Sequence, residues 1–174
     1  MYPEELIDAR RRAAWGSAAF LVVGPGSVTG LVPWLLTRWR ARRPVPGGVP
    51  AQLLGTAMIL VGGAALTRSF AHFVIAGMGT PVPGAPPSKL VVTGVYRHVR
   101  NPMYGAMQLM IIGQALLLGQ SRLYVWSSVA AALPAAYVPL REEPVLRERF
   151  GEEYDRYCRN VPRWLPRLRP WHQD

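Results

Sequence analysis

Four stretches of the sequence carry no charged side chain, and their lengths restrict the folds open to the chain. They are 24, 17, 16 and 18 residues long and cover Ala13–Leu36, Ala51–Thr67, Met103–Leu118 and Leu123–Leu140. A helix of about 20 apolar residues crosses the hydrocarbon core of a bilayer. Only helices and closed barrels satisfy their backbone hydrogen bonds there. The runs therefore predict an all-α integral membrane bundle of about four transmembrane helices.

The first run and the last two runs carry further signals. Gly24-Pro25-Gly26 lies in the middle of the first run. Membrane helices tolerate such residues when neighbours satisfy the freed backbone groups, so a kinked span is expected, with a re-entrant hairpin as the alternative. The last two runs are separated only by Gly119–Arg122 and should form an antiparallel helical hairpin. Pro139 is expected to weaken the second helix of that hairpin before the charged residues begin.

The charge of the chain limits its partners. The formal net charge is +10, and it comes almost wholly from arginine, because Lys89 is the single lysine. Such a charge suits either nucleic acid or anionic membrane lipid. The apolar runs favour the lipid and argue against nucleic acid. Cys158 is the single cysteine, so an intrachain disulfide and a metal cluster built on several thiolates are excluded, and no metal site is expected.

The orientation in the membrane is predicted from the lysines and arginines, which are enriched in cytoplasmic loops. A four-span arrangement with both termini inside places Lys89, Arg97, Arg100 and the basic tail in the cytoplasm. The arginines left outside are Arg38, Arg40, Arg42, Arg43 and Arg122. The rule favours this arrangement overall, although the first four of them, in the first outer loop, violate it. The acidic start of the chain shows no cleavable signal peptide, so the first run is expected to remain as an anchor. We therefore expect a multi-pass inner-membrane protein with a cytoplasmic tail.

A basic, aromatic and polar segment, Gly94–Gly105, runs directly into the third apolar run. Pro102 suits the first turn of a helix, because its missing N–H would have no intrahelical partner. The free N–H groups of that turn favour an anion. The hairpin should return Glu142 and Glu143 to this level, opposite the basic segment. A ligand with both an anionic and a cationic group, such as a zwitterionic amino-acid head group, would fit there, and simple pairing of the arginines with the glutamates is the alternative.

Two further groups of residues have both a structural and a functional interpretation. Arg68 and His72 are four residues apart and share a helix face. Arg68 either snorkels to the lipid headgroups or lines a polar pocket together with His72. Tail residues at helical spacing form one apolar face, which packs in a core, lies on the membrane or closes over a pocket. These residues are Phe150, Tyr154, Tyr157 and Val161.

The combined motifs resemble those of a known family. The pattern is Gly94-x-Tyr96, then Arg100-Asn101-Pro102-x-Tyr104-Gly105, then an apolar hairpin and Glu142-Glu143. It is similar to that of the isoprenylcysteine carboxyl methyltransferases, and equally to the wider group that includes bacterial phospholipid N-methyltransferases. The segments Gly79-Thr80-Pro81-x-Pro83 and Phe150–Trp164 are also similar to the bacterial members. The likeness covers roughly residues 77–166, about half of the chain.

This resemblance implies an all-helical membrane enzyme that transfers a methyl group from S-adenosylmethionine to a lipophilic acceptor and releases S-adenosylhomocysteine. The arginine-to-tyrosine motif would hold the methionyl part of the cofactor, and the paired glutamates would take its ammonium group or the ribose hydroxyls. The segment 90–96 would cover the adenosine. The cofactor-binding residues so implied are Leu90, Val92, Gly94, Tyr96, Arg100, Asn101, Pro102, Tyr104, Glu142, Glu143, Tyr154 and Tyr157.

The catalytic candidates are Glu143, His98 and Arg100. A carboxylate acceptor needs no base, whereas an amine acceptor must first lose a proton, for which Glu143 or His98 is the candidate. The prenylcysteine enzymes usually have histidine where this chain has Asn101. Asparagine donates hydrogen bonds but does not titrate, so binding is expected at this position and proton transfer is not.

The chain is interpreted as one methyltransferase domain with four parts. These are the first two spans (1–76), a cofactor-binding loop (77–102), the helical hairpin (103–140) and a cytoplasmic tail that closes the cofactor pocket (141–174). Two other functions remain open. One is a membrane reductase similar to the NADPH-dependent sterol reductases. The other is a small non-enzymatic membrane protein whose basic tail docks on anionic lipid.

Overall fold

The structure is a computed structural model, and it describes residues 22–75 and 90–172. The start of the first apolar run, the loop 76–89 and its Gly79-Thr80-Pro81 motif lie outside the described residues. Every regular element in the described ranges is helical, as the apolar runs predicted. In chain order the elements are η1 (Ser27–Leu31), α2 (Val32–Thr37), α3 (Gly48–Ile75), η2 (Gly94–Arg97), α4 (Pro102–Leu118), α5 (Ser121–Tyr137), η3 (Val138–Glu142) and α6 (Glu143–Asn160).

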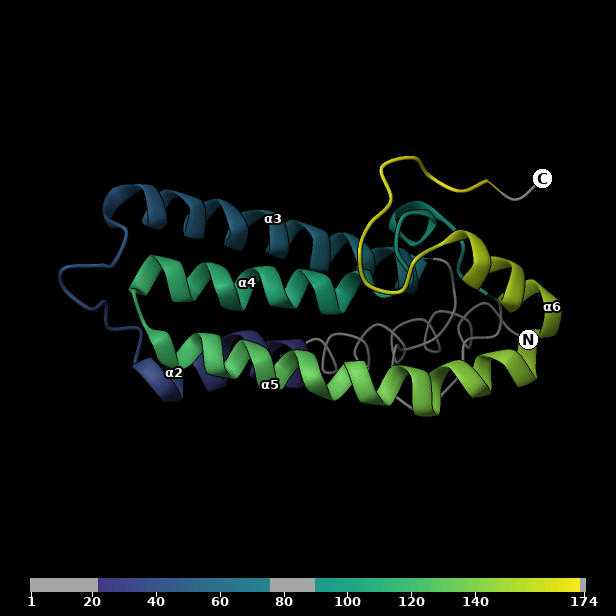
Figure 1. The fold of residues 1–174 in the computed structure, drawn as a ribbon, viewed down its shortest axis with the longest axis horizontal. Coiled ribbons are helices and arrows are strands. Elements are labelled where there is room, and N and C mark those ends of the chain that lie inside the picture. The colour runs from purple at the N-terminus through teal and green to yellow at the C-terminus, as the bar shows by residue number, and fades with distance from the viewer. Residues whose placement is uncertain (1–21, 76–89, 173–174) are drawn as a thin grey trace, which may run out of the picture.

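The helices α2, α3, α4 and α5 run side by side along the long axis of the molecule (Figure 1). The most extensive packing is between α3 and α4, and α4 then packs against α5. At one end of this bundle α5 continues through η3 into α6, which turns across the end beside η2 and the C-terminal segment (Figure 1). Elements from three regions of the sequence therefore meet at a single end of the bundle.

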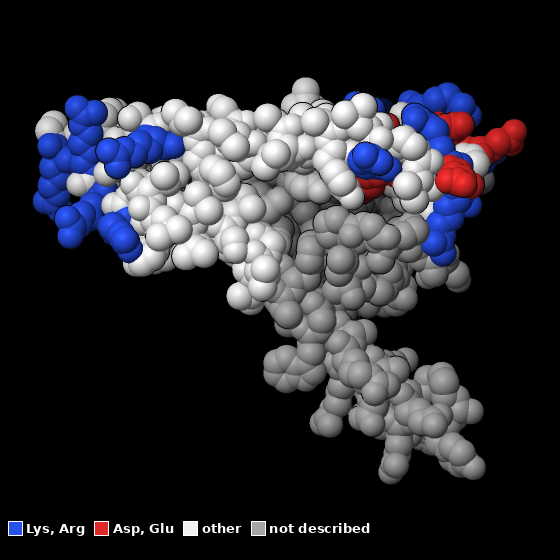
Figure 2. Space-filling model, turned by 90° about the horizontal axis from the view of Figure 1, so that it is seen from below, with Lys and Arg blue, Asp and Glu red and all other residues white. Residues whose placement is uncertain are grey.

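On the face that Figure 2 shows, charged side chains gather at the two ends of the bundle and leave its middle uncharged. We call one of these the arginine end; its charged residues are Arg38, Arg40, Arg42, Arg43 and Arg122. The other is the glutamate end, and it holds Glu142, Glu143 and every other acidic residue of the described ranges. Such a distribution is typical of a protein whose middle faces lipid.

Among the described residues, two helices are long and apolar enough to cross a membrane, Gly48–His72 and Ser121–Asn160. Two shorter apolar helices, Ser27–Thr37 and Pro102–Leu118, lie beside them. The apolar part of the second long helix ends at Leu140, because eleven of the twenty residues 141–160 are Arg, Asp or Glu. The residues from Arg141 onward therefore lie outside the membrane-spanning part. The all-helical class is confirmed, and the number of four spans stays a prediction.

The described part of the first apolar run is helical from residue 22 to Thr37 apart from a turn at Gly24, and the π-helical turn η1 directly follows Gly24-Pro25-Gly26, where the sequence predicted a kink. The Thr29 hydroxyl donates to the Pro25 carbonyl at 2.7 Å, and Thr37 donates to the Pro33 carbonyl at 2.7 Å. Each hydroxyl thus bonds to the backbone carbonyl four residues earlier, so these buried polar side chains are satisfied within their own helix. The alternative of a re-entrant hairpin concerns residues that are in part outside the described ranges.

The predicted hairpin is present, with a tighter turn than expected. The helix α4 begins at Pro102 as predicted, and α5 already begins at Ser121, so the turn consists of Gly119 and Gln120. Gly119 has a φ of 66°, and a Cβ atom there would lie 2.7 Å from Pro46 Cδ. Glycine is therefore required both for the left-handed backbone and for the close approach of the neighbouring loop.

Pro139 interrupts the regular α-helix, as expected, but does not end the helical chain. The chain passes from α5 through the π-helical turn η3 and continues as α6. A proline has no N–H and its ring clashes with the carbonyl of residue i−4. The wider π turn accommodates this, and the N–H of Glu143 bonds to the carbonyl of Val138. The continuous helix carries Glu142 and Glu143 to the glutamate end.

Glycines allow α3 and α4 to approach closely. A Cβ atom on Gly113 would lie 2.6 Å from the Gly55 carbonyl, and one on Gly62 would lie 2.8 Å from the Ala106 carbonyl. Small residues at such contacts are how membrane helices gain packing energy. On Gly63, which lies on the same helix α3, a Cβ atom would meet nothing within 4 Å.

We expect Gly113→Ala and Gly63→Ala to change the stability in opposite directions. Overpacking between the two backbones should cost Gly113→Ala about 1–3 kcal/mol. Gly63→Ala removes backbone entropy from the unfolded chain and should stabilise by about 0.5–1 kcal/mol. Thermal unfolding of both purified variants in one detergent measures this. No decrease for Gly113→Ala would show that α3 and α4 are not in close contact at Gly113, and a decrease for Gly63→Ala would show that Gly63 does not face open space.

Candidate functional site

A buried carboxylate joins the three segments that meet at the glutamate end. Glu143 is 2% exposed and lies at the start of α6. Arg100 Nη1 donates to its Oε1 at 2.9 Å. Arg163, from the segment after α6, donates through Nε to Oε1 at 2.6 Å and through Nη2 to Oε2 at 2.9 Å. Arg147 adds a longer ion pair at 3.8 Å. Such a two-pronged arginine contact fixes the geometry as well as the charge.

The surroundings of Glu143 keep it ionised. Burial raises the pKa of this carboxyl, but the hydrogen bond from Arg163 and the charges of Arg100, Arg163 and Arg147 outweigh burial, so its pKa lies below the usual value of 4.5. A carboxylate held this way is a weak proton acceptor. Its geometry suits the role of joining Arg100 to the rest of the site. Its assigned role as a catalytic base remains a prediction.

The segment after α6 lies along the loop 97–101, and we call it the C-terminal segment (residues 161–171). Arg100 N–H donates to the Pro162 carbonyl at 2.9 Å, and Asn101 Nδ2 donates to the Arg163 carbonyl at 3.2 Å. Two more bonds follow: Arg167 N–H donates to the His98 carbonyl, and Trp171 N–H donates to the Arg97 carbonyl, both at 3.0 Å. The loop that the sequence singled out is thus covered by residues from more than sixty positions later.

His98 and Asn101 take part in this covering through their side chains. His98 Nδ1 is hydrogen-bonded to the Arg167 carbonyl at 2.8 Å, so the ring is oriented by the C-terminal segment. Asn101 uses one amide hydrogen on Arg163, and its side-chain amide has a second hydrogen to donate. Both side chains are half-buried. Their predicted roles towards a ligand therefore concern the groups that remain, His98 Nε2 and the second Asn101 hydrogen.

The tail aromatics form a small core. Tyr154, Tyr157 and Val161 are buried together with Val92, and Leu90 and Trp171 pack against them. Tyr157 also donates its hydroxyl to the Tyr96 carbonyl at 2.7 Å. The interpretation of the tail face as core packing is confirmed for these residues. Whether Tyr154, Tyr157, Leu90 and Val92 also touch a cofactor stays a prediction.

A second carboxylate at this end has a different environment. Glu142 is half-buried, and no ion pair within the described ranges involves it. Burial raises its pKa above 4.5, and the charge of Glu143 raises it further. Its charge acts on the phenols of Tyr96 and Tyr104, so the three side chains lie near one another. Tyr104 is covered by Trp164, with ring centroids 6.2 Å apart.

The glutamate end also holds a donor without an acceptor. Arg100 Nε is buried and has no hydrogen-bond partner among the described residues, whereas its Nη1 is bonded to Glu143 and Cys158 Sγ. Burying an unpaired donor costs free energy, which a ligand with an acceptor group would recover. The end therefore offers an unpaired half-buried carboxylate and an unpaired buried cation donor.

The remaining predicted residues lie close to this region. Gly94 has a φ of 58°, and His72 lies against it: a Cβ on Gly94 would be 3.1 Å from the His72 ring, which bonds Thr93 Oγ1 at 2.7 Å. Arg68 is exposed. Pro102 begins α4 and brings Tyr104 into the first turn. No group of three or more His, Cys, Asp or Glu side chains suitable for a metal ion occurs in the described ranges.

Arg163, Arg167 and Trp171 were not among the predicted site residues. All three bind the loop 97–101 or Glu143. The segment Val161-Pro162-Arg163-Trp164 was noted as similar to bacterial members of a family, which is the one sequence signal that pointed to Arg163. Arg167 and Trp171 have no periodic pattern around them.

A family model described as phospholipid methyltransferase matches residues 50–153 of the chain. The matched region contains α3 from its third residue onward, the loop 94–101, the hairpin and both glutamates. It ends before Tyr154 and the C-terminal segment. No curated protein matches the chain.

Proposed function

Because the chain belongs to the phospholipid methyltransferase family, it is a membrane methyltransferase, and we propose that it uses S-adenosylmethionine to methylate a carboxylate or an amine of a lipophilic acceptor. The cofactor would bind at the glutamate end and leave as S-adenosylhomocysteine. The acceptor would reach the same end from the bilayer.

The observation that carries this proposal is the pair of unsatisfied groups at the glutamate end. Glu142 is half-buried without a cation within the described ranges, and Arg100 Nε is buried without an acceptor there. The methionyl part of the cofactor has an ammonium and a carboxylate group. The ammonium group matches Glu142, and the carboxylate matches Arg100 and the second amide hydrogen of Asn101.

The two glutamates would then have separate tasks. Glu143 would hold Arg100 in place through their ion pair, and Arg147 and Arg163 would fix Glu143 in turn. Glu142 would bind the cofactor. With an amine acceptor, Glu143 or His98 would be needed as the proton acceptor, and His98 is favoured because the arginine partners of Glu143 lower its pKa and Glu142 would be paired with the cofactor ammonium. A carboxylate acceptor would need neither.

The bound cofactor supplies a methyl group on a positively charged sulfur, which is open to direct displacement. The protein must then orient the acceptor and exclude water, and these two effects provide most of the acceleration in such a reaction. The aromatic residues Tyr96, Tyr104 and Trp164, together with the C-terminal segment, are the part of the chain that we assign to this task.

We place the glutamate end in the cytoplasm of a multi-pass inner-membrane protein. Within the described ranges it holds eleven of the sixteen lysines and arginines, and the arginine end holds five. The side richer in Lys and Arg is usually cytoplasmic, and acidic residues count little in this rule. The cofactor would then enter from the cytoplasm.

Purified protein should bind S-adenosylhomocysteine with a micromolar dissociation constant, about −8 kcal/mol. Calorimetry and the shift of thermal unfolding in detergent measure this. NADPH, tested in parallel, should give no shift. Stabilisation by NADPH alone would favour the reductase interpretation, and stabilisation by neither would leave a non-enzymatic protein.

The acceptor is identified by a separate assay. Membranes that contain the protein are incubated with methyl-labelled S-adenosylmethionine, and lipid extract and protein are counted. Label in the lipid extract supports a lipid acceptor. Label in protein alone contradicts a lipid acceptor.

A further inference from the structure

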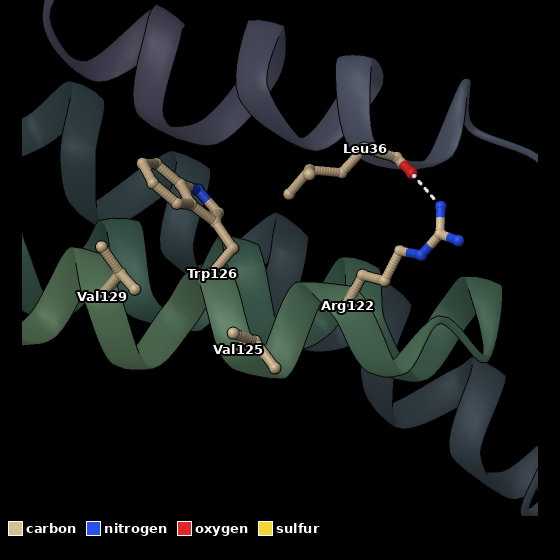
Figure 3. A pocket seen from close by; sticks show the side chains of 5 residues that line it. All are labelled: Leu36, Arg122, Val125, Trp126 and Val129. Carbon is tan, nitrogen blue, oxygen red and sulfur yellow. Dashed lines mark hydrogen bonds between the residues drawn. The ribbon is translucent and has the colours of Figure 1, made fainter.

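A groove lies between α2 and α5, away from the glutamate end. It has a volume of about 290 Å³ and is lined by Leu36, Arg122, Val125, Trp126 and Val129. Figure 3 shows Trp126, Val125 and Val129 along α5 and Leu36 opposite them, with Arg122 at one end. The groove is thus apolar along its length, with a single cation at its end.

Hydrogen bonds hold the walls of this groove in place. Trp126 Nε1 donates to the Val28 carbonyl of the first helix at 2.9 Å. Arg122 Nη1 donates to the Leu36 carbonyl at 3.4 Å, which leaves the other guanidinium hydrogens free to bind (Figure 3). Both bonds connect α5 to the first helix. The groove therefore exists before any ligand enters, which lowers the cost of binding.

The cation at the end of the groove belongs to the arginine end. The Arg42 N–H donates to the Leu118 carbonyl at 2.8 Å, and Gln120 Nε2 donates to the Arg40 carbonyl at 2.7 Å. These bonds hold the loop with Arg38, Arg40, Arg42 and Arg43 against the turn that precedes Arg122. All five arginines are exposed. No acidic residue of the described ranges lies at this end, so the positive charge there is not neutralised by the protein (Figure 2).

We propose that this groove binds an anionic phospholipid, with one acyl chain along Val125, Trp126 and Val129 and the phosphate on Arg122. The apolar length matches an acyl chain, and the uncompensated arginines match a net negative headgroup. Trp34 and Trp39, at the same end, are residues that prefer the headgroup level of a bilayer. A zwitterionic headgroup would place its own cation near the positively charged arginines. A free phosphate has no acyl chain and would leave the apolar groove empty.

The site lies at the opposite end of the bundle from Glu142 and Arg100, so it does not depend on the proposed methyl transfer. It holds a lipid of the leaflet at the arginine end. This lipid would bridge the first helix and α5 and so stabilise the bundle.

Purified full-length protein in detergent is titrated with long-chain phosphatidylglycerol, long-chain phosphatidylcholine and glycerol phosphate. Retained lipid is counted by native mass spectrometry, and stabilisation is measured by thermal unfolding. Phosphatidylglycerol should bind at least about tenfold more tightly than phosphatidylcholine, because both lipids offer a phosphate to Arg122 but the choline cation of the latter is repelled by the neighbouring arginines. Glycerol phosphate should have no effect. Equal binding of the two lipids, or equal stabilisation by glycerol phosphate, would overturn the proposal.

Two variants and two controls locate the site. Arg122→Gln removes the phosphate contact, and Val125→Trp fills the groove at a side chain that is 67% exposed. Each should weaken phosphatidylglycerol binding about tenfold or more. The controls are Arg43→Gln at the same end and Val61→Trp on α3, where the side chain is 60% exposed. Both controls should bind phosphatidylglycerol with nearly the affinity of the unchanged protein. If Arg43→Gln weakens binding as much as Arg122→Gln, the attraction is a general one and the assigned site is wrong.

Discussion

Replacing Glu143 with glutamine is expected to lower the free energy of unfolding by about 3–5 kcal/mol, which is the usual cost of removing one partner from a buried ion pair. The side chain is 2% exposed and accepts hydrogen bonds from Arg100 and Arg163. Glutamine has nearly the same shape but no charge, so both guanidinium groups would remain without a counter-charge. The C-terminal segment would lose its main attachment to α6. Thermal unfolding of the purified variant in detergent measures the loss.

Glu148→Gln is the matched control, because Glu148 lies on the same helix and is exposed. It should change the stability by less than about 0.5 kcal/mol. The double variant Glu143→Gln with Arg163→Gln should recover part of the loss, because it removes a cation that the single variant leaves unpaired. Equal stabilities of Glu143→Gln and the unchanged protein would show that the network does not hold the C-terminal segment.

Replacing Glu142 with glutamine is expected to weaken ligand binding without lowering the stability, unlike Glu143→Gln. Affinity for S-adenosylhomocysteine should fall about tenfold or more, since a charge-assisted hydrogen bond contributes about 1.5–3 kcal/mol. The stability should stay unchanged or rise slightly, because a half-buried carboxylate beside Glu143 is removed. Calorimetry measures the first effect and thermal unfolding the second. Unchanged affinity would exclude Glu142 from the cofactor site.

The carboxyl groups of Glu142 and Glu143 should take up a proton in different pH ranges. The pKa of Glu142 is raised above 4.5, so as the pH falls from neutral it takes up a proton while still above 4.5. The pKa of Glu143 is lowered, so its contribution to stability is fully present above 4.5 and is lost only as the pH falls through its lower value. Cofactor-product affinity should therefore fall at a higher pH than stability does. A simultaneous loss of both would contradict the separate roles.

The sequence predicted the helices and the hairpin well, because the length of an uncharged run is a physical requirement for crossing lipid. It also predicted that Glu142 and Glu143 return to the level of Arg100, since two antiparallel helices of similar length must end together. The start of α4 at Pro102 was predicted from backbone chemistry alone. These features depend on local composition and chain geometry.

The partners of the loop 97–101 were not predictable in the same way. Arg167 and Trp171 lie in a segment rich in proline and arginine, without the periodicity that indicates which side is buried. Their bonds to His98 and Arg97 connect residues far apart in the chain, and many arginines compete for such contacts. The different environments of Glu142 and Glu143 could not be predicted either. The two residues are identical and adjacent in the sequence, and only the direction in which each side chain faces distinguishes them.

The helix that leads through the π-helical turn Val138–Glu142 to Glu143 must keep its number of residues. Each residue of an α-helix turns the chain by about 100° and advances it by about 1.5 Å. A deletion of one residue in α5, before this turn, would rotate α6 by about that angle and move Glu143 away from Arg100 and Arg163. Substitutions at Val138 or Leu140 can conserve the site, but a change in length cannot. The register of the two glutamates is therefore set by the number of residues before them as much as by their chemistry.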